Sequence, residues 1–99
     1  MPKLEYDNKF RDLITIRSGT SLRIPVGVSG IPKPTIAWNK DDQKIKSQGR
    51  LSLDATPTGS TLMIKKVTRE DDGMYTILAE NEAGDAKASF DVEVTGEVI

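Results

Sequence analysis

The chain has neither cysteine nor histidine among its 99 residues. It therefore lacks a thiol nucleophile, the side chain that titrates near neutral pH, and the commonest protein ligands of zinc. A serine nucleophile in this chain would need an unusual base. The composition predicts that the chain is not an enzyme and that it holds no catalytic residue, no cofactor and no metal.

Long apolar runs are missing as well. No segment approaches the ~18 consecutive apolar residues of a membrane span, and the amino end has no apolar core typical of a signal peptide. The 14 basic and 15 acidic side chains leave a net charge of −1, and aromatic residues make up 5% of the chain. Because no net field attracts a polyanion and few rings are available for base stacking, we expect neither nucleic-acid nor membrane binding.

Basic residues nevertheless gather in two stretches. Binding of actin, nucleic acid or anionic lipid is one interpretation of them, and a solvated surface is the other. The charge balance favours the solvated surface. The residues concerned are Lys65, Lys66 and Arg69, and Lys33, Lys40, Lys44 and Lys46.

The apolar residues that are present alternate with polar ones. Trp38, the only tryptophan, ends the run Pro34–Trp38, in which Ile36 and Trp38 fall on one face of a strand of period two. The same pattern, interrupted by turn residues, predicts a single all-β domain with no α-helix. Strands are expected at 13–16, 22–28, 35–39, 50–54, 75–80 and 86–94, with another around Leu62 and Ile64, and Ile45 heading a short one.

Pro25 conflicts with the strand at 22–28, because proline cannot donate a hydrogen bond within a sheet. We expect either a bulge at Pro25 or a position where the missing N–H would have met no partner.

Three separated segments form a recognisable pattern. They are Gly30–Lys40, the spaced residues Asp71, Gly73, Tyr75, Ile77, Ala79 and Asn81, and Ala83–Gly84. Together they resemble the intermediate-set (I-set) immunoglobulin family, and within it the domains of giant muscle proteins of the titin and twitchin type. The resemblance implies an immunoglobulin-like (I-set) two-sheet Greek-key sandwich without the B–F disulfide. It covers a core of about residues 13–94, and within the single domain 1–99 we expect residues 1–10 and 95–99 to be flanking linker segments.

The resemblance also assigns core positions. Val26 and Ile77 stand where the family carries its two bridging cysteines, and a buried tryptophan, here Trp38, packs against that pair. Apolar packing must then replace a cross-link worth roughly 4 kcal/mol for a loop of about 50 residues. The expected core is Val26, Trp38, Leu62, Ile64, Tyr75 and Ile77.

A tyrosine corner is expected at Asp71, Gly73 and Tyr75 by the same resemblance. The acidic run 70–72 lacks the alternating oxygen ligands of a calcium loop. We expect Asp71 to brace the corner near Arg50 or the tyrosine backbone, with Glu70 and Asp72 facing water.

The implied function is structural. We expect a non-catalytic, mechanically resistant spacer and scaffold in a tandem array of a large cytoplasmic protein of the sarcomere, whose parent can contain a kinase elsewhere. Shear is expected between residues 13–16 and the strand around Phe90, Val92 and Val94. The isolated domain is expected to be monomeric. Neighbouring immunoglobulin or fibronectin-type domains and thick-filament or other sarcomeric proteins are the expected partners.

Two alternatives stay open. The first is a module that docks a muscle or cytoskeletal partner on a sheet face or edge, with Ile14–Ile16 and the last strand as candidate edges. The second is an extracellular adhesion domain, which the lack of cysteine disfavours.

Overall fold

Strands account for most of the chain in the computed structural model, which describes residues 2–7, 13–56 and 58–96. The strands are β1 (Lys3–Glu5), β2 (Ile14–Arg17), β3 (Leu22–Ser29), β4 (Thr35–Lys40), β5 (Gln43–Lys44), β6 (Leu51–Thr56), β7 (Gly59–Ile64), β8 (Gly73–Asn81) and β9 (Gly84–Thr95). A single turn of 3-10 helix, η2 (Arg69–Asp71), precedes β8.

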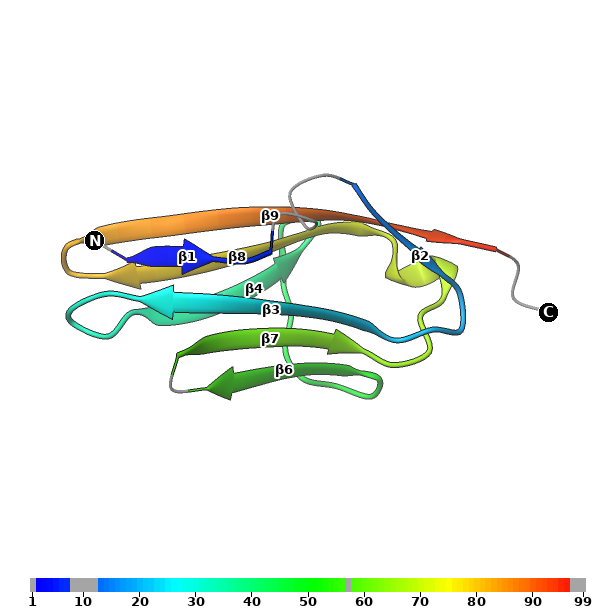
Figure 1. The fold of residues 1–99 in the computed structure, drawn as a ribbon, viewed down its shortest axis with the longest axis horizontal. Helices are drawn as coiled ribbons and strands as arrows, with labels where there is room; N and C mark the ends of the chain where they lie inside the picture. The colour runs from blue at the N-terminus through cyan, green and yellow to red at the C-terminus, as the bar shows by residue number, and fades with distance from the viewer. Residues whose placement is uncertain (1, 8–12, 57, 97–99) are drawn as a thin grey trace.

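Two sheets face each other. One has the order β1-β3-β7-β6, and the other has the order β2-β9-β8-β4-β5 (Figure 1). All strand pairs are antiparallel except β2 with β9. The expected all-β sandwich of two sheets is confirmed.

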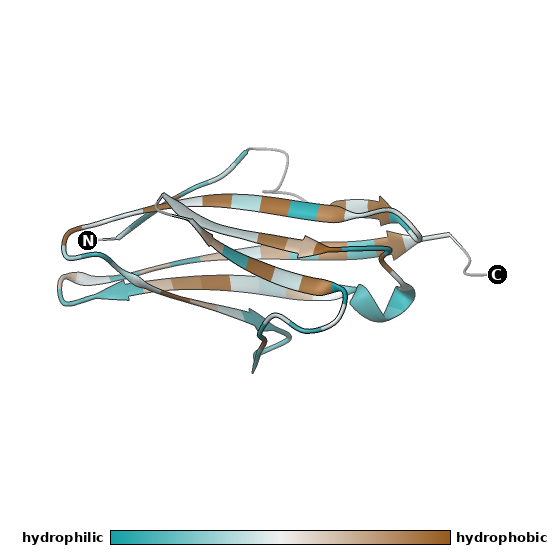
Figure 2. Ribbon diagram, turned by 90° about the horizontal axis from the view of Figure 1, so that it is seen from below, coloured by the Kyte–Doolittle hydropathy of each residue, from teal (hydrophilic) through white to brown (hydrophobic). Residues whose placement is uncertain are grey.

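The core lies between the sheets and follows the period-two pattern. Figure 2 shows hydrophobic and hydrophilic residues alternating along the long strands. In β3 the residues Leu22, Ile24 and Val26 are buried while Arg23 and Pro25 are exposed. Burial of one face of each strand supplies most of the stabilisation.

Pro25 lies in the β3–β7 register opposite Thr61, with no bulge. The N–H of Val28 donates to the Thr58 carbonyl on the β7 side, so by alternation the backbone nitrogen of Pro25 faces the β1 side. There the pairing of β1 ends at Glu5 opposite Gly27. The second of the two expectations for Pro25 therefore holds.

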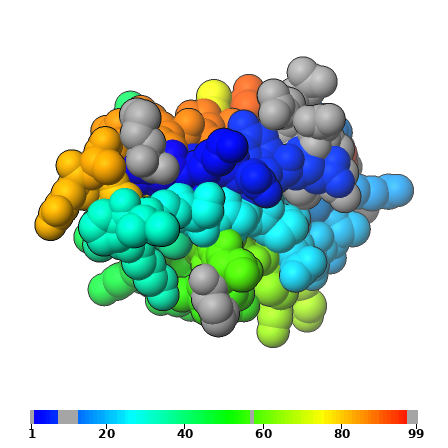
Figure 3. Space-filling model, turned by 60° about the vertical axis from the view of Figure 1, so that its left-hand side comes forward, coloured from blue at the N-terminus to red at the C-terminus, as the bar shows by residue number. Residues whose placement is uncertain are grey.

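The expected flanking segments need correction. Lys3–Glu5 are not a linker but form β1, which pairs with β3. In Figure 3 this segment (dark blue) lies between β3 (cyan) and β9 (orange). Its three residues are too few to show a pattern, and its pairing is non-local, which is why the sequence did not predict it. Thr95 similarly ends β9, whereas residues 8–10 and 97–99 lie outside the described residues.

Candidate functional site

The centre of the sandwich is held by apolar packing and by one hydrogen bond between the sheets. Val26 and Ile77 are 4% and 0% exposed and belong to one core cluster with Trp38. Trp38 lies opposite Ile77 in the β4–β8 register, and Val26 lies opposite Ser60 in the β3–β7 register. The indole N–H of Trp38 donates to Ser60 Oγ at 3.0 Å. A polar bridge thus joins the two sheets beside the pair at the cysteine positions.

Sequence reasoning missed Ser60, because the strand was expected only around Leu62 and Ile64. In the structure β7 begins at Gly59, and Ser60 is 5% exposed. The period-two pattern, extended back by two residues from Leu62, was the signal that would have placed Ser60 inside. The remaining core residues of the prediction, Leu62, Ile64 and Tyr75, are buried too.

The corner between β7 and β8 brings together Asp71, Gly73 and Tyr75. The phenol of Tyr75 donates to the Asp71 carbonyl at 2.7 Å. The carboxylate of Asp71 accepts from the Thr68 N–H at 2.8 Å and from Arg50 Nη1 at 3.0 Å. One aspartate therefore ties the helical turn η2 to both β8 and the start of β6.

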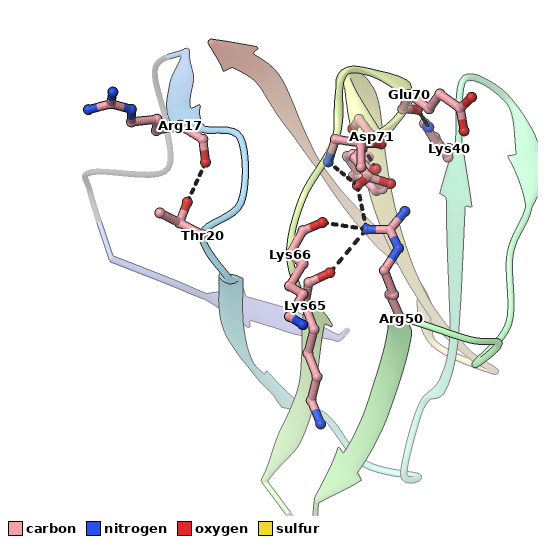
Figure 4. Close-up of polar contacts among 10 residues, drawn as sticks. Arg17, Thr20, Lys40, Arg50, Lys65, Lys66, Glu70 and Asp71 are labelled. Atoms are coloured by element: carbon pink, nitrogen blue, oxygen red, sulfur yellow. Dashed lines mark hydrogen bonds and ion pairs between the residues drawn. The ribbon is translucent and has the colours of Figure 1, made fainter. Parts of the chain in front are cut away.

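Arg50 serves the same corner with further bonds. Its Nη1 also donates to the carbonyls of Lys65 and Lys66, at 3.0 and 2.9 Å, where the chain leaves β7 (Figure 4). The hydrogen bond and charge of Asp71 raise the pKa of Arg50. The guanidinium thus donates to backbone carbonyls that lie just beyond the end of β7, which is a structural use of its planar set of donors.

Tyr75 is almost fully buried, at 1% exposure. Burial raises the pKa of its phenol, and the nearby carboxylates of Asp71, Asp41 and Asp72 raise it further, while Arg50 lowers it. Lys40 lies with its Nζ 5.7 Å from the ring centroid, and this Nζ donates to the Glu70 carbonyl at 2.5 Å. The phenol therefore stays protonated at neutral pH and acts as a hydrogen-bond donor.

Gly73 lets β8 begin close to the turn between β4 and β5. It has φ +150°, and a Cβ added there would lie 2.7 Å from Asp41 Oδ2. Asp41 itself pairs with Met74, since its Oδ1 accepts the Met74 N–H at 3.0 Å and its own N–H donates to the Met74 carbonyl at 2.9 Å.

At the end of the molecule where β9 finishes, β2 and β9 run parallel. The register joins Ile14 to Val92 and continues to Arg17 opposite Thr95. The N–H of Ser18 then donates to the Thr95 carbonyl at 2.8 Å. Phe90, expected in this pairing, lies before it and is buried in the core.

Asp72 strengthens the same end of the molecule. It was expected to face water, but its side chain is half-buried and Oδ1 accepts the backbone N–H of Val94. That expectation was wrong because β9 continues past the start of β8 and needs an acceptor there. Glu70 is exposed, as expected.

Among the described residues, no group of three acidic, histidine or cysteine side chains is arranged to hold a metal ion. No helix within the described ranges is long and apolar enough to cross a membrane.

Comparison with known proteins gives consistent results. The family model of the immunoglobulin I-set domain matches residues 6–94. Titin of Drosophila melanogaster is 38% identical over 93 residues, which is 94% of this chain and, rounded, 0% of that protein. Slow-type myosin-binding protein C of Homo sapiens is 38% identical over 95 residues, which is 94% of this chain and 8% of that protein. The chain thus spans only a small part of these relatives.

A solved structure extends the comparison. A chain in the crystal structure of the titin M10–obscurin-like 1 Ig complex is 28% identical, with a TM-score of 0.83 over 99% of this chain and 97% of that one.

Proposed function

The chain belongs to the immunoglobulin I-set family, and from this premise we propose that it is a non-catalytic, mechanically resistant spacer and scaffold of a large sarcomeric protein. The similarity to titin and myosin-binding protein C supports a muscle parent, of which this chain resembles one small part. The absence of cysteine supports a reducing, cytoplasmic location. Neighbouring immunoglobulin or fibronectin-type domains in the same chain are the partners we propose first.

The shape of the molecule suits a position in series. Its principal extents are 48 × 26 × 22 Å. Strand β1 begins near one end of the long axis and β9 finishes at the other (Figure 1). Tension applied through the chain therefore acts along the strands.

The observation that carries the proposal is the parallel pairing of β2 with β9. From the amino end, tension first meets the short β1–β3 pair, and once that pair opens it pulls β2 from its amino end while β9 is pulled from its carboxyl end. Because the two strands are parallel, these opposite pulls slide one strand along the other, and the hydrogen bonds between them share the load and must break together. The hydrogen bonds from Ser18 to Thr95 and from Val94 to Asp72 further hold β9 in place at this end of the sheet.

Proline substitution tests the pairing directly. The Ser18–Thr95 bond shows that Thr95 faces β2, so by alternation the Glu93 N–H also faces β2, whereas the N–H of Thr15, opposite Glu93, faces away from β9. Both side chains are exposed. Glu93→Pro therefore removes a donor from the pair, and Thr15→Pro is the matched control.

The measurement is single-molecule pulling of a tandem array that contains this domain. We expect Glu93→Pro to lower the unfolding force clearly and Thr15→Pro to leave it close to that of the unchanged domain. Equal forces for all three proteins would refute the role of the pairing. A force for the unchanged domain no higher than that of a helical bundle would refute mechanical resistance itself.

Partner binding at a sheet edge is the second candidate, and the edge position of β2 favours it. The other edge considered from the sequence, the last strand, lies between β2 and β8 where β2 covers it, so β2 is the outer strand there. The similar chain in the titin M10–obscurin-like 1 Ig complex supports an immunoglobulin domain as partner. Crosslinking of the intact parent in muscle separates the candidates, because recurrent links to one other protein favour binding and links to adjoining domains favour the spacer.

A further inference from the structure

Strand β4 has an outer edge that is only partly covered. On one side it pairs with β8 from Thr35 to Lys40. On the other side β5 pairs only with Asn39 and Lys40, and the N–H of Ile45 donates to the Trp38 carbonyl at 3.0 Å. No strand in the described part of the chain continues this pairing toward Thr35.

The uncovered part of the edge presents a backbone donor and acceptor. The Trp38 carbonyl faces β5, and the N–H of Asp41 donates to Met74 on the β8 side. Backbone groups alternate in direction along a strand, so the N–H and carbonyl of Ile36 face the uncovered edge together with Trp38. A strand added at this edge would find both groups of Ile36 available.

The opposing sheet also presents an edge here, that of β6. Its first residues are covered, because Leu51 and Gln48 exchange backbone hydrogen bonds and the Leu53 N–H donates to Ser47 Oγ at 2.8 Å. The next residue that faces this edge by alternation is Ala55, which is exposed.

Between the two edges lies a hollow of about 290 Å³. Trp38 and Ser60 line it together with the apolar side chains Ile36, Leu53 and Ala55. Lys44, Ile45 and Lys46 line both this hollow and a neighbouring one of about 550 Å³, which extends to Leu51. We call the two hollows together the β4–β6 groove.

The charge at the groove is of one sign. Lys44 and Lys46 are exposed, and no acidic side chain of the described residues lines either hollow. Asp41, whose carboxylate accepts the Met74 N–H, and Asp42 lie in the turn between β4 and β5 and line neither hollow. The groove therefore pairs an apolar floor with a cationic rim on a chain whose net charge is −1.

We propose that the β4–β6 groove binds an extended segment of a partner protein in which apolar and acidic residues alternate. The segment would add to β4 as a strand, with main-chain hydrogen bonds to Ile36. Alternate side chains of a strand point to opposite faces. The apolar set would then fill the hollow beside Trp38 and Ser60, and the acidic set would lie near Lys44 and Lys46. This surface is separate from the β2–β9 pair, so it does not depend on the proposed mechanical role.

The test uses the 99-residue chain labelled with ¹⁵N and three synthetic hexapeptides with blocked ends. The first alternates valine and glutamate, the second alternates valine and lysine, and the third is the glutamate peptide N-methylated at every second residue. We expect the glutamate peptide to shift the amide signals of Ile36, Ile45 and Ala55 in a saturable way. The lysine peptide and the N-methylated peptide should bind at least about threefold more weakly.

Charge reversal supplies the matched control. Lys44→Glu with Lys46→Glu should weaken binding of the glutamate peptide about three- to tenfold, as two exposed ion pairs are lost. Lys65→Glu with Lys66→Glu makes the same change in net charge on exposed residues that line neither hollow, and it should leave the affinity unchanged. Amide spectra of both variants establish that they fold.

Four results would overturn the proposal. They are the absence of shifts at the groove, equal binding of the lysine peptide, equal binding of the N-methylated peptide, and equal weakening by the two double variants. The last would show that only net charge matters.

Discussion

Replacing Ser60 with alanine tests whether a buried hydrogen bond helps to take the place of the family disulfide. Ser60 Oγ accepts the indole N–H of Trp38 at 3.0 Å, and the two residues are 5% and 3% exposed. Alanine keeps nearly the same volume but leaves the indole N–H without this acceptor. Leaving a buried donor unpaired costs about 1–3 kcal/mol.

That loss is large for a domain of this size. Small domains unfold with total free energies on the order of 5–15 kcal/mol, so one bond of this kind is a sizeable part of the whole. A loss of about 2 kcal/mol would lower the urea midpoint by ~1–2 M. Ser52→Ala is the control, since its hydroxyl bonds Asp54 at 3.3 Å at the surface and its removal should cost less than about 0.5 kcal/mol.

A double-mutant cycle with Trp38→Phe separates the bond from other effects. Far-UV circular dichroism follows the urea unfolding of all four proteins, because the variants with Trp38→Phe lack the only tryptophan of the chain and hence its fluorescence. With phenylalanine at position 38 no indole donor remains, so Ser60→Ala should then cost little, and the coupling energy should exceed about 1 kcal/mol. Additive effects would show that the hydrogen bond contributes nothing measurable and would refute the reasoning.

The remaining predictions concern the corner before β8. Tyr75→Phe should cost about 1 kcal/mol at neutral pH through its lost bond to Asp71. The pKa of Tyr75 in the folded protein is raised above the unfolded value of about 10. The protonated phenol therefore gives its full stabilisation below pH ~10, and above that pH the free energy of unfolding falls by up to about 1.4 kcal/mol per pH unit. Urea midpoints measured against pH should fall less steeply for Tyr75→Phe than for the unchanged chain, and equal slopes would contradict this. Gly73→Ala should cost about 1–3 kcal/mol, since its φ of +150° and Asp41 leave no room for a Cβ. Gly49→Ala is the control, since Gly49 also has a positive φ, +57°, but has open space around it. If both variants lose the same thermal stability, the contact with Asp41 does not explain the loss at Gly73.

The features that the sequence predicted are those with a local pattern. Trp38, Leu62 and Ile64 are buried on β4 and β7, as the period-two pattern read from the sequence predicted. The positions of Val26 and Ile77 required more, because they came from spacing relative to Trp38 within a family resemblance. Both are buried in the core cluster that contains Trp38.

The features that the sequence did not predict depend on pairing between distant segments. Strand β1 forms because residues 3–5 pair with β3, with Glu5 opposite Gly27. Asp72 accepts a hydrogen bond only because β9 continues to Val94, beyond the start of β8. The β4–β6 groove was not predicted, because it exists only where β5 stops short along β4. None of these leaves a periodic signal within one segment.

The missing cross-link also determines what happens after the sandwich yields to force. In the family arrangement a disulfide between positions 26 and 77 would hold about 50 residues inside a closed loop, which tension cannot extend. Here Val26 and Ile77 are joined only by packing, so rupture of the β2–β9 pair releases the whole chain. At about 3.5 Å per residue the 99 residues span roughly 350 Å, against a folded length of 48 Å. The pulling experiment should therefore show an extension of about 300 Å per domain, some 180 Å more than a cross-linked domain of equal length would release. The shear-resistant pair determines the force at which the domain opens, and the cysteine-free core determines how much chain is then released.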